Sequence, residues 1–243
     1  MKTILVVGLI VAALLTVTLT SMKRQQGDQQ EGRSESSDWK ERGTVAWHVK
    51  KAKERGDKEI FLPGPQIENV DNIRDINEAL KFYSVVVAEP VDKKSFYQSP
   101  LWIATWYKLR VIETLSQRPF RQCVLCPSSQ NAPLEMSSLN SDEILVSKTG
   151  GTVDIDGVKV TMGDSGFPDF EVSKKYLLFL EVDSTGQQGA IMVGPNGTFK
   201  VNGDETITPV TRGTHSLKNI MKAQFNDSVR SLREKTKGHS GSR

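Results

Sequence analysis

The sequence predicts a mainly β (α+β) chain: a small closed or half-closed β-barrel with helices at both of its ends. Residues 84–211 contain several short segments that alternate apolar and polar side chains or are continuously apolar, as strands do. The segment 101–115 is long enough to bend across two sheets. Helical apolar spacing occurs before and after this region, which places the helices at the ends. A β-sandwich is the alternative arrangement.

The N-terminal residues 1–24 predict a transmembrane anchor. Residues 3–22 form an almost unbroken apolar run, and at about 1.5 Å per residue such a helix spans a bilayer core. Lys23 and Arg24 follow at once, and residues 16–21 have no A-x-A cleavage pattern. A cleaved signal peptide and a buried helix are the alternatives. The flanking charges nearly balance, and we expect the bulk of the chain outside the cytoplasm, because a short N-terminal tail is the easier end to retain.

Composition divides the rest of the chain. Residues 25–38 are rich in Gln, Gly, Ser and charge, which predicts a disordered stalk. Residues 39–83 form a helical lead-in, with apolar residues at helical spacing in 39–55 and 72–83. Residues 212–235 predict one amphipathic helix, and 236–243 a disordered basic tail.

Charge is unevenly distributed between the strand region and the C-terminal end. Residues 60–211 carry 13 Lys and Arg against 19 Asp and Glu, a net charge of −6, whereas residues 212–243 carry 8 against 2, a net charge of +6. A basic end suits an anionic surface such as lipid headgroups or a partner, and it also suits a plain solvated end.

Turn residues separate the expected strands. Asp156-Gly157 is a strong two-residue hairpin signal, and Pro90 is expected to end the first strand. The expected strands are 84–88, 101–115, 143–147, 152–155, 158–162, 175–182, 189–193 and 197–201.

Several strand segments also carry a family resemblance. "YSVVVAEPV", "WIATWYKLRVIETL", "KKYLLFLEVD" and "GAIMVGPNGTFKV" resemble an uncharacterised group of bacterial extracytoplasmic β-domains over residues 83–201. More distantly, the order of elements is similar to the netrin-like modules of tissue inhibitors of metalloproteinases, which are OB-fold barrels. The resemblance implies an OB-fold layout. It implies no protease inhibition, because those modules depend on an N-terminal Cys and several disulfides that this chain lacks.

The two cysteines, Cys123 and Cys126, lie in a proline-containing loop over residues 118–139. One C-x-x-C supplies two of the four ligands of a zinc site, and Pro127 stands where a c-type haem motif needs His. In an oxidising compartment we expect a local disulfide. Redox-active thiols, a metal site and free thiols are the alternatives, and we expect no metal or other cofactor.

Gly163-Asp-Ser-Gly166 matches the nucleophile segment of chymotrypsin-like serine proteases. His48, however, stands in a basic helical segment, and Phe167 occupies the next family position, usually Gly. Phe167 also breaks the G-x-S-x-G elbow of α/β-hydrolases. We therefore expect a polar turn here, with a hydrolase that uses Ser165 as the alternative.

Trp102 and Trp106 share one face of the segment 101–115, with Ala104 between them. They form either an aromatic platform for a polysaccharide or a peptide, or part of the core. The chain contains no phosphate loop or dinucleotide fingerprint.

These observations predict a single-pass membrane protein: a membrane-tethered extracytoplasmic binding or interaction module, with a protein or polysaccharide partner, no nucleic acid and no catalysis of its own. The alternative is an envelope enzyme, either a thiol-redox protein using Cys123 and Cys126 or a hydrolase using Ser165.

Overall fold

The computed structural model describes residues 41–64, 73–116, 133–136, 138–163, 166–182, 188–191, 194–211 and 215–239. In these residues two β-sheets and four α-helices confirm the prediction of a mainly β chain. The elements, in chain order, are α3 (Val45–Arg55), β1 (Glu59–Pro63), α4 (Ile76–Phe82), β2 (Ser84–Ser99), β3 (Trp102–Ser116), β4 (Glu143–Thr149), β5 (Gly151–Ile155), β6 (Val158–Gly163), β7 (Lys175–Val182), β8 (Gln188–Ile191), β9 (Thr198–Val201), β10 (Ile207–Pro209), α5 (Ser216–Phe225) and α6 (Val229–His239).

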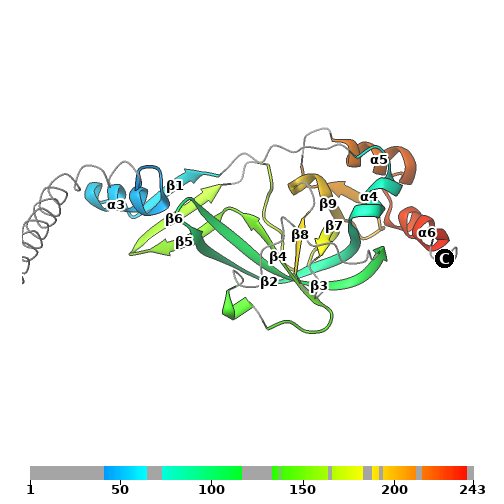
Figure 1. Cartoon of the computed structure of the whole chain (residues 1–243), viewed down its shortest axis with the longest axis horizontal. Helices are drawn as coiled ribbons and strands as arrows, with labels where there is room; N and C mark the ends of the chain where they lie inside the picture. Colours follow the sequence, from blue (N-terminus) through cyan, green and yellow to red (C-terminus); the bar gives the residue numbers. More distant parts are fainter. Residues whose placement is uncertain are drawn as a thin grey trace, which may run out of the picture.

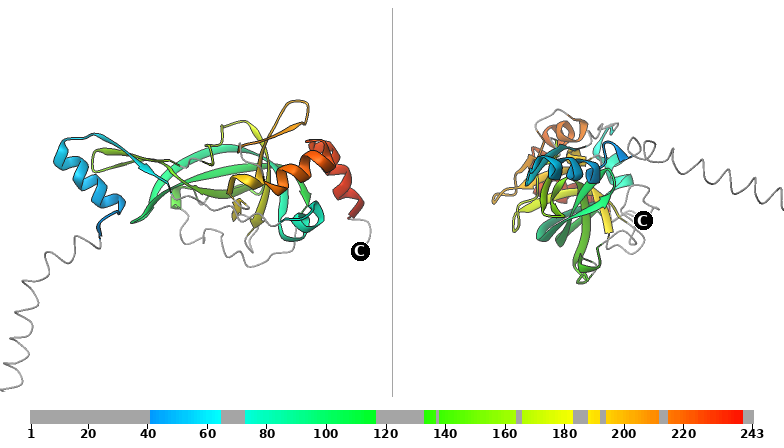
Figure 2. Two further views of the ribbon diagram at one scale, coloured as in Figure 1. Left: turned by 90° about the horizontal axis from the view of Figure 1, so that it is seen from above. Right: turned by 90° about the vertical axis from the view of Figure 1, so that its left-hand side faces the viewer.

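The larger sheet has seven strands in the order β10-β9-β7-β2-β3-β4-β8, with an additional pairing between β7 and β8. The longest strands of this sheet are β2 and β3, which form an antiparallel hairpin. The hairpin runs from the C-terminal helices to the end occupied by α3 (Figures 1 and 2). The sequence predicts a closed or half-closed barrel. In the described residues no closed barrel is found, and the strands form two sheets.

Strand β2 is longer than expected, because Pro90 does not end it. A register shift between Pro90 and Asp92 accommodates the proline, and the strand continues to Ser99. A bulge is where a residue without a backbone N–H can stand inside a ladder.

The smaller sheet has the order β1-β6-β5 and carries α3 on one side. Asp156 and Gly157, at φ 52° and 78°, form the turn of the β5–β6 hairpin, as the sequence predicts. Helix α3 begins after Thr44, whose hydroxyl accepts a hydrogen bond from the Trp47 N–H. It ends at Gly56, at φ 78°.

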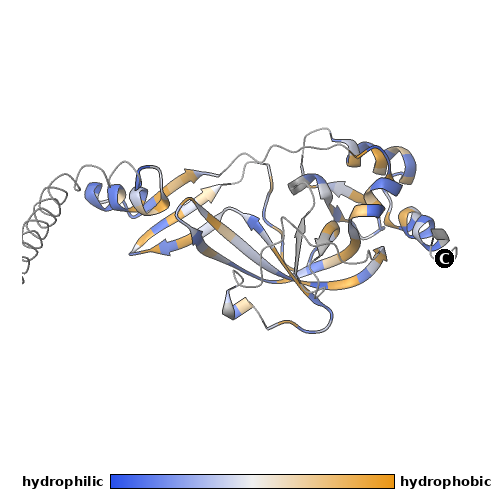
Figure 3. Cartoon of the chain, in the orientation of Figure 1, coloured by the Kyte–Doolittle hydropathy of each residue, from blue (hydrophilic) through white to orange (hydrophobic). Residues whose placement is uncertain are grey.

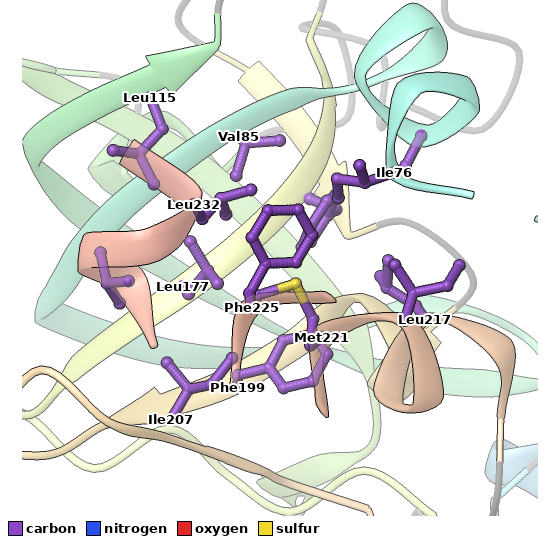
Figure 4. Close-up of a cluster of buried hydrophobic side chains, with 14 of the residues drawn as sticks. Ile76, Val85, Leu115, Leu177, Phe199, Ile207, Leu217, Met221, Phe225 and Leu232 are labelled. Atoms are coloured by element: carbon purple, nitrogen blue, oxygen red, sulfur yellow. The ribbon is translucent and has the colours of Figure 1, made fainter. Parts of the chain in front are cut away.

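Helices α4, α5 and α6 cover one face of the larger sheet. Their apolar residues pack on inward-facing strand residues such as Leu177 and Phe199, with Met221 and Phe225 of α5 at the centre of the cluster (Figure 4). Hydrophobic and hydrophilic residues alternate along α5, as its position on a sheet requires (Figure 3). The opposite face of the sheet has its own core, which includes Tyr107, Phe167 and Tyr176.

The single helix expected over residues 212–235 is two helices. Asn226 and Asp227 both take left-handed backbone angles, at φ 49°, and separate α5 from α6. Asn and Asp tolerate this conformation better than most residues, so the break has a local cause. Backbone hydrogen bonds from Ile207 N to Asp227 O (2.8 Å) and from Val229 N to Glu205 O (3.0 Å) attach the break to the β9–β10 hairpin.

The expected disorder after residue 235 is also wrong for the first part of the tail. Helix α6 continues to His239, and Thr236 is buried. No helix in the described part of the chain is long and apolar enough to cross a membrane. The anchor predicted over residues 1–24 and the stalk over 25–38 lie outside the described residues.

Candidate functional site

The predicted site residues fall in very different places. Cys123, Cys126 and Ser165 lie outside the described residues. The two tryptophans of β3 are described, and the structure separates them: Trp102 is exposed and Trp106 is fully buried.

Of the two alternatives for this pair, a binding platform or part of the core, Trp106 takes the core position and does not belong to an exposed surface. Its ring packs in a small core with Ala104, Met136 and Leu145. The reason lies in the strand register, because β4 covers β3 only from Ala104 to Arg110 and leaves Trp102 beyond its end.

A cleft of about 480 Å³ opens on the helix-covered face of the larger sheet, at the edge of its core. Ile112, which is 44% exposed, and the half-buried Val201 supply apolar surface, whereas Val87 and Val229, which also line the cleft, are buried. Charged and polar side chains surround it, and a volume of this size is typical of ligand sites. The lining residues are Val87, Ile112, Glu113, Ser173, Lys174, Lys175, Lys200, Val201, Asn202, Gly203, Glu205, Val229 and Arg233.

One wall of the cleft is an ion-pair network centred on Arg233. Its guanidinium donates from Nε to Glu113 Oε1 (2.5 Å) and from Nη2 to Glu113 Oε2 (2.8 Å), and Nη2 also donates to Glu205 Oε1 (2.9 Å). Hydrogen bonds to Glu113 and then to Glu205 raise the pKa of Arg233 further above its usual value. The hydrogen bond from Arg233 is the largest cause that lowers the pKa of Glu205. This fork fixes α6 against β3 and the β9–β10 turn.

The other wall carries three lysines. Lys200 is paired with Glu171, with 2.7 Å between Nζ and Oε1. Lys174 and Lys175, at the start of β7, make no ion pair with any described residue. The four lining cations exceed the two lining anions by two charges, and Glu171, which is paired with Lys200 just outside the lining, reduces this excess to one.

Two lining residues have unusual backbone angles. Ser173 and Glu205 have φ of 62° and 64°, in the left-handed region that costs a residue with a side chain about 1 kcal/mol or more. The Ser173 N–H donates to Pro90 O (3.1 Å), and the Glu205 carboxylate is held by Arg233. Such strain is concentrated at functional sites in proteins, and here it stands on both sides of the cleft.

A second charged group is built into the opposite face of the sheet. Lys148 of β4 has a side chain only 5% exposed, and its Nζ donates to Phe167 O (2.5 Å) and lies 3.1 Å from Asp169 Oδ1. Burial raises the pKa of Asp169, but hydrogen bonds and charge from Lys148 outweigh it and leave the pKa below its usual value. Burial, and then the charge of Asp169, raise the pKa of Tyr107. This group anchors residues 166–170, and Asp169 also lines a smaller cleft of about 170 Å³ together with Phe170 and Tyr176.

Sequence reasoning missed the cleft because its residues come from five separate segments. The excess of basic residues after position 211 was the one signal, and it contributes Arg233. In the described part of the chain no group of three or more His, Cys, Asp and Glu side chains is placed to hold a metal ion. No family model, curated protein or solved structure matches the chain.

Proposed function

We propose that the chain is a membrane-tethered extracytoplasmic binding module whose cleft holds an acidic segment of a partner protein. The observation that carries the proposal is the pair Lys174 and Lys175, without ion-pair partners among the described residues, beside apolar surface in a cleft of about 480 Å³. A carboxylate ligand gains charge complementarity there, and its aliphatic part gains contact with Ile112 and Val201.

The proposal includes no reaction. Glu113 and Glu205, the carboxylates that line the cleft, are both bound by Arg233. A general acid or base needs a carboxyl group that is free to reach a substrate, and the guanidinium of Arg233 engages both of these.

An OB-fold layout is the finer fold that we propose. Strand β2 pairs with β3 and β7, β3 pairs with β4, and β8 pairs in parallel with β4 and antiparallel with β7. These pairings connect five strands in a ring, which supports a partly open five-stranded barrel of the OB type, a fold that often serves as a binding module. In this reading the smaller sheet and α3 are additions to the barrel.

The ligand proposal is tested by fluorescence anisotropy with a fluorescein-labelled oligoglutamate peptide and the full chain in detergent. Reversing the two charges in Lys174→Glu/Lys175→Glu should lower the affinity roughly tenfold or more, and added salt should weaken binding by the unchanged chain. The matched control is Lys81→Glu/Lys222→Glu, which changes the same charge at exposed helix positions outside the cleft.

Equal affinity of both double variants would refute the assignment of the cleft. Binding of oligogalacturonate but not of oligoglutamate, lost in the same cleft variant, would show that the ligand is an acidic polysaccharide. The tether is tested separately: the full chain should stay with membranes after alkaline carbonate extraction, and release into the soluble fraction would refute it.

A further inference from the structure

The end of the β2–β3 hairpin is an exposed, uncharged apolar surface. Tyr97 is 42% exposed, Leu101 59% and Trp102 42%, so three of the seven exposed large hydrophobic residues in the described chain fall within six positions. Residues 95–107 contain no charged side chain. Scattered apolar residues on a surface are ordinary, but a cluster without charge indicates a contact.

This hairpin end is held firmly against α3. The Val45 N–H donates to Pro100 O (2.8 Å), and the Leu101 N–H donates to Ser99 Oγ (3.2 Å). Next to them, Ile103 is fully buried in the core that α3 shares with the smaller sheet. The exposed side chains are therefore presented by a fixed turn.

The hairpin end also lies next to α3, the first helix of the described fold after the predicted anchor. Val45, its contact, is the first residue of α3, and α3 stands at the end of the molecule opposite α6 (Figures 1 and 2). Sixteen residues, 25–40, separate the predicted anchor from Glu41, and fully extended they reach at most roughly 55 Å. The hairpin end is thus confined near any membrane that holds residues 1–24.

We propose that this hairpin end, Tyr97, Leu101 and Trp102, docks on the lipid surface of the membrane that carries the anchor. The inference rests on the proposed membrane tether. Trp and Tyr are the side chains that favour the headgroup level, and Leu101 at the tip reaches farther toward the acyl chains. The three half-exposed side chains offer roughly 300 Å², well below the 800 Å² or so per partner of a stable protein interface.

Docking orients the module and leaves the cleft accessible. The cleft is lined by β3, β7, β9 and α6, and α6 is at the far end of the molecule from α3. Glu41 and Arg42, the exposed charges before α3, cancel each other. In α3 itself, three of the four basic side chains are ion-paired with carboxylates, so the docking rests on apolar contact and needs no anionic lipid.

The test uses the full chain with Cys123→Ser/Cys126→Ser, reconstituted in phosphatidylcholine vesicles with and without phosphatidylglycerol. A single Leu101→Cys carries an environment-sensitive NBD fluorophore. The control label is Val172→Cys, an apolar position of similar exposure. Its neighbour Ser173 is hydrogen-bonded to Pro90, nine residues before the end of β2 at Ser99, so this label lies away from the hairpin end. Brominated lipids should quench the label at 101 severalfold more than the label at 172, equally in both vesicle types. Adding Trp102→Asp should return the emission at 101 to that of a label in water.

The outcomes separate the inference from the tether. A chain that floats with the vesicles but shows equal quenching at 101 and 172 overturns the docking and leaves the tether standing. A chain that does not float overturns both. The label at 101 could also show a blue-shifted emission that brominated lipid does not quench and that increases with protein concentration. That result would show that a second copy covers the surface, and it would also overturn the docking.

Discussion

The buried Lys148 stabilises the fold, and replacing it should cost measurable free energy. In Lys148→Met a side chain of similar length replaces one that is only 5% exposed, so packing is nearly conserved. The substitution removes the donor to Phe167 O (2.5 Å) and the ion pair with Asp169 (3.1 Å). Asp169 keeps a weaker pair with Lys93 at 3.3 Å.

The magnitude follows from these contacts. A hydrogen bond from a charged donor contributes about 1.5–3 kcal/mol, and the carbonyl of Phe167 loses it. Against this, an apolar side chain avoids the desolvation of an ammonium group, and Asp169 is half exposed and screened by water. We expect a net decrease of about 1–2 kcal/mol in the free energy of unfolding.

The assay is urea unfolding of the purified chain, followed by tryptophan fluorescence, to which the buried Trp106 contributes. The matched control is Lys159→Met, which removes an exposed lysine 3.0 Å from Glu59 and should cost no more than about 0.5 kcal/mol. If Lys148→Met is as stable as the unchanged chain or more stable, desolvation outweighs the contacts of this lysine, and the reasoning is refuted.

Three further predictions use the same unfolding assay. Phe225→Ala should lower the free energy of unfolding by about 3–5 kcal/mol, since the ring is buried at the centre of the helix-covered core; a loss below 1 kcal/mol would show that the core is loosely packed. Gly151→Ala should cost about 2 kcal/mol or more, because φ is +135° and an added Cβ would collide with the Thr105 hydroxyl, whereas Gly203→Ala meets open space and should be nearly neutral. For Asp169→Asn the test is the pH dependence of the free energy of unfolding. The pKa of Asp169 in the folded chain lies below the usual 3.8, so its ionised carboxylate stabilises the fold above pH 3.8. This stabilisation is lost as the pH falls through the folded pKa. The stability difference between this variant and the unchanged chain should therefore be constant above about pH 5 and shrink below 3.8; a difference that persists at the lowest pH would contradict it.

Much of the fold was predictable from local patterns. The Asp156-Gly157 hairpin and the buried β7 strand follow from turn chemistry and from apolar runs, which act over a few residues. The expectations that failed depend on neighbours in space: Pro90 is tolerated inside β2 through a register shift with β3, and the break at Asn226 is held by the β9–β10 hairpin. Trp106 looked equivalent to Trp102 because strand alternation cannot show where a neighbouring strand ends.

By itself, the sequence determined that this chain is mainly β with terminal helices and that its C-terminal end is basic; the membrane anchor over its first 24 residues stays a prediction. Only the tertiary structure decided which basic side chains act together. Arg233, Lys175 and Glu113 are far apart along the chain, and they line one cleft because β3 and β7 both pair with β2 and because α6 packs across them. The same holds for the hairpin end, where a hydrogen bond between Val45 and Pro100 places α3 beside the turn that carries exposed Trp102. Periodicity and composition act along the chain, whereas a binding surface depends on which strands pair, and that is settled only when the sheet forms.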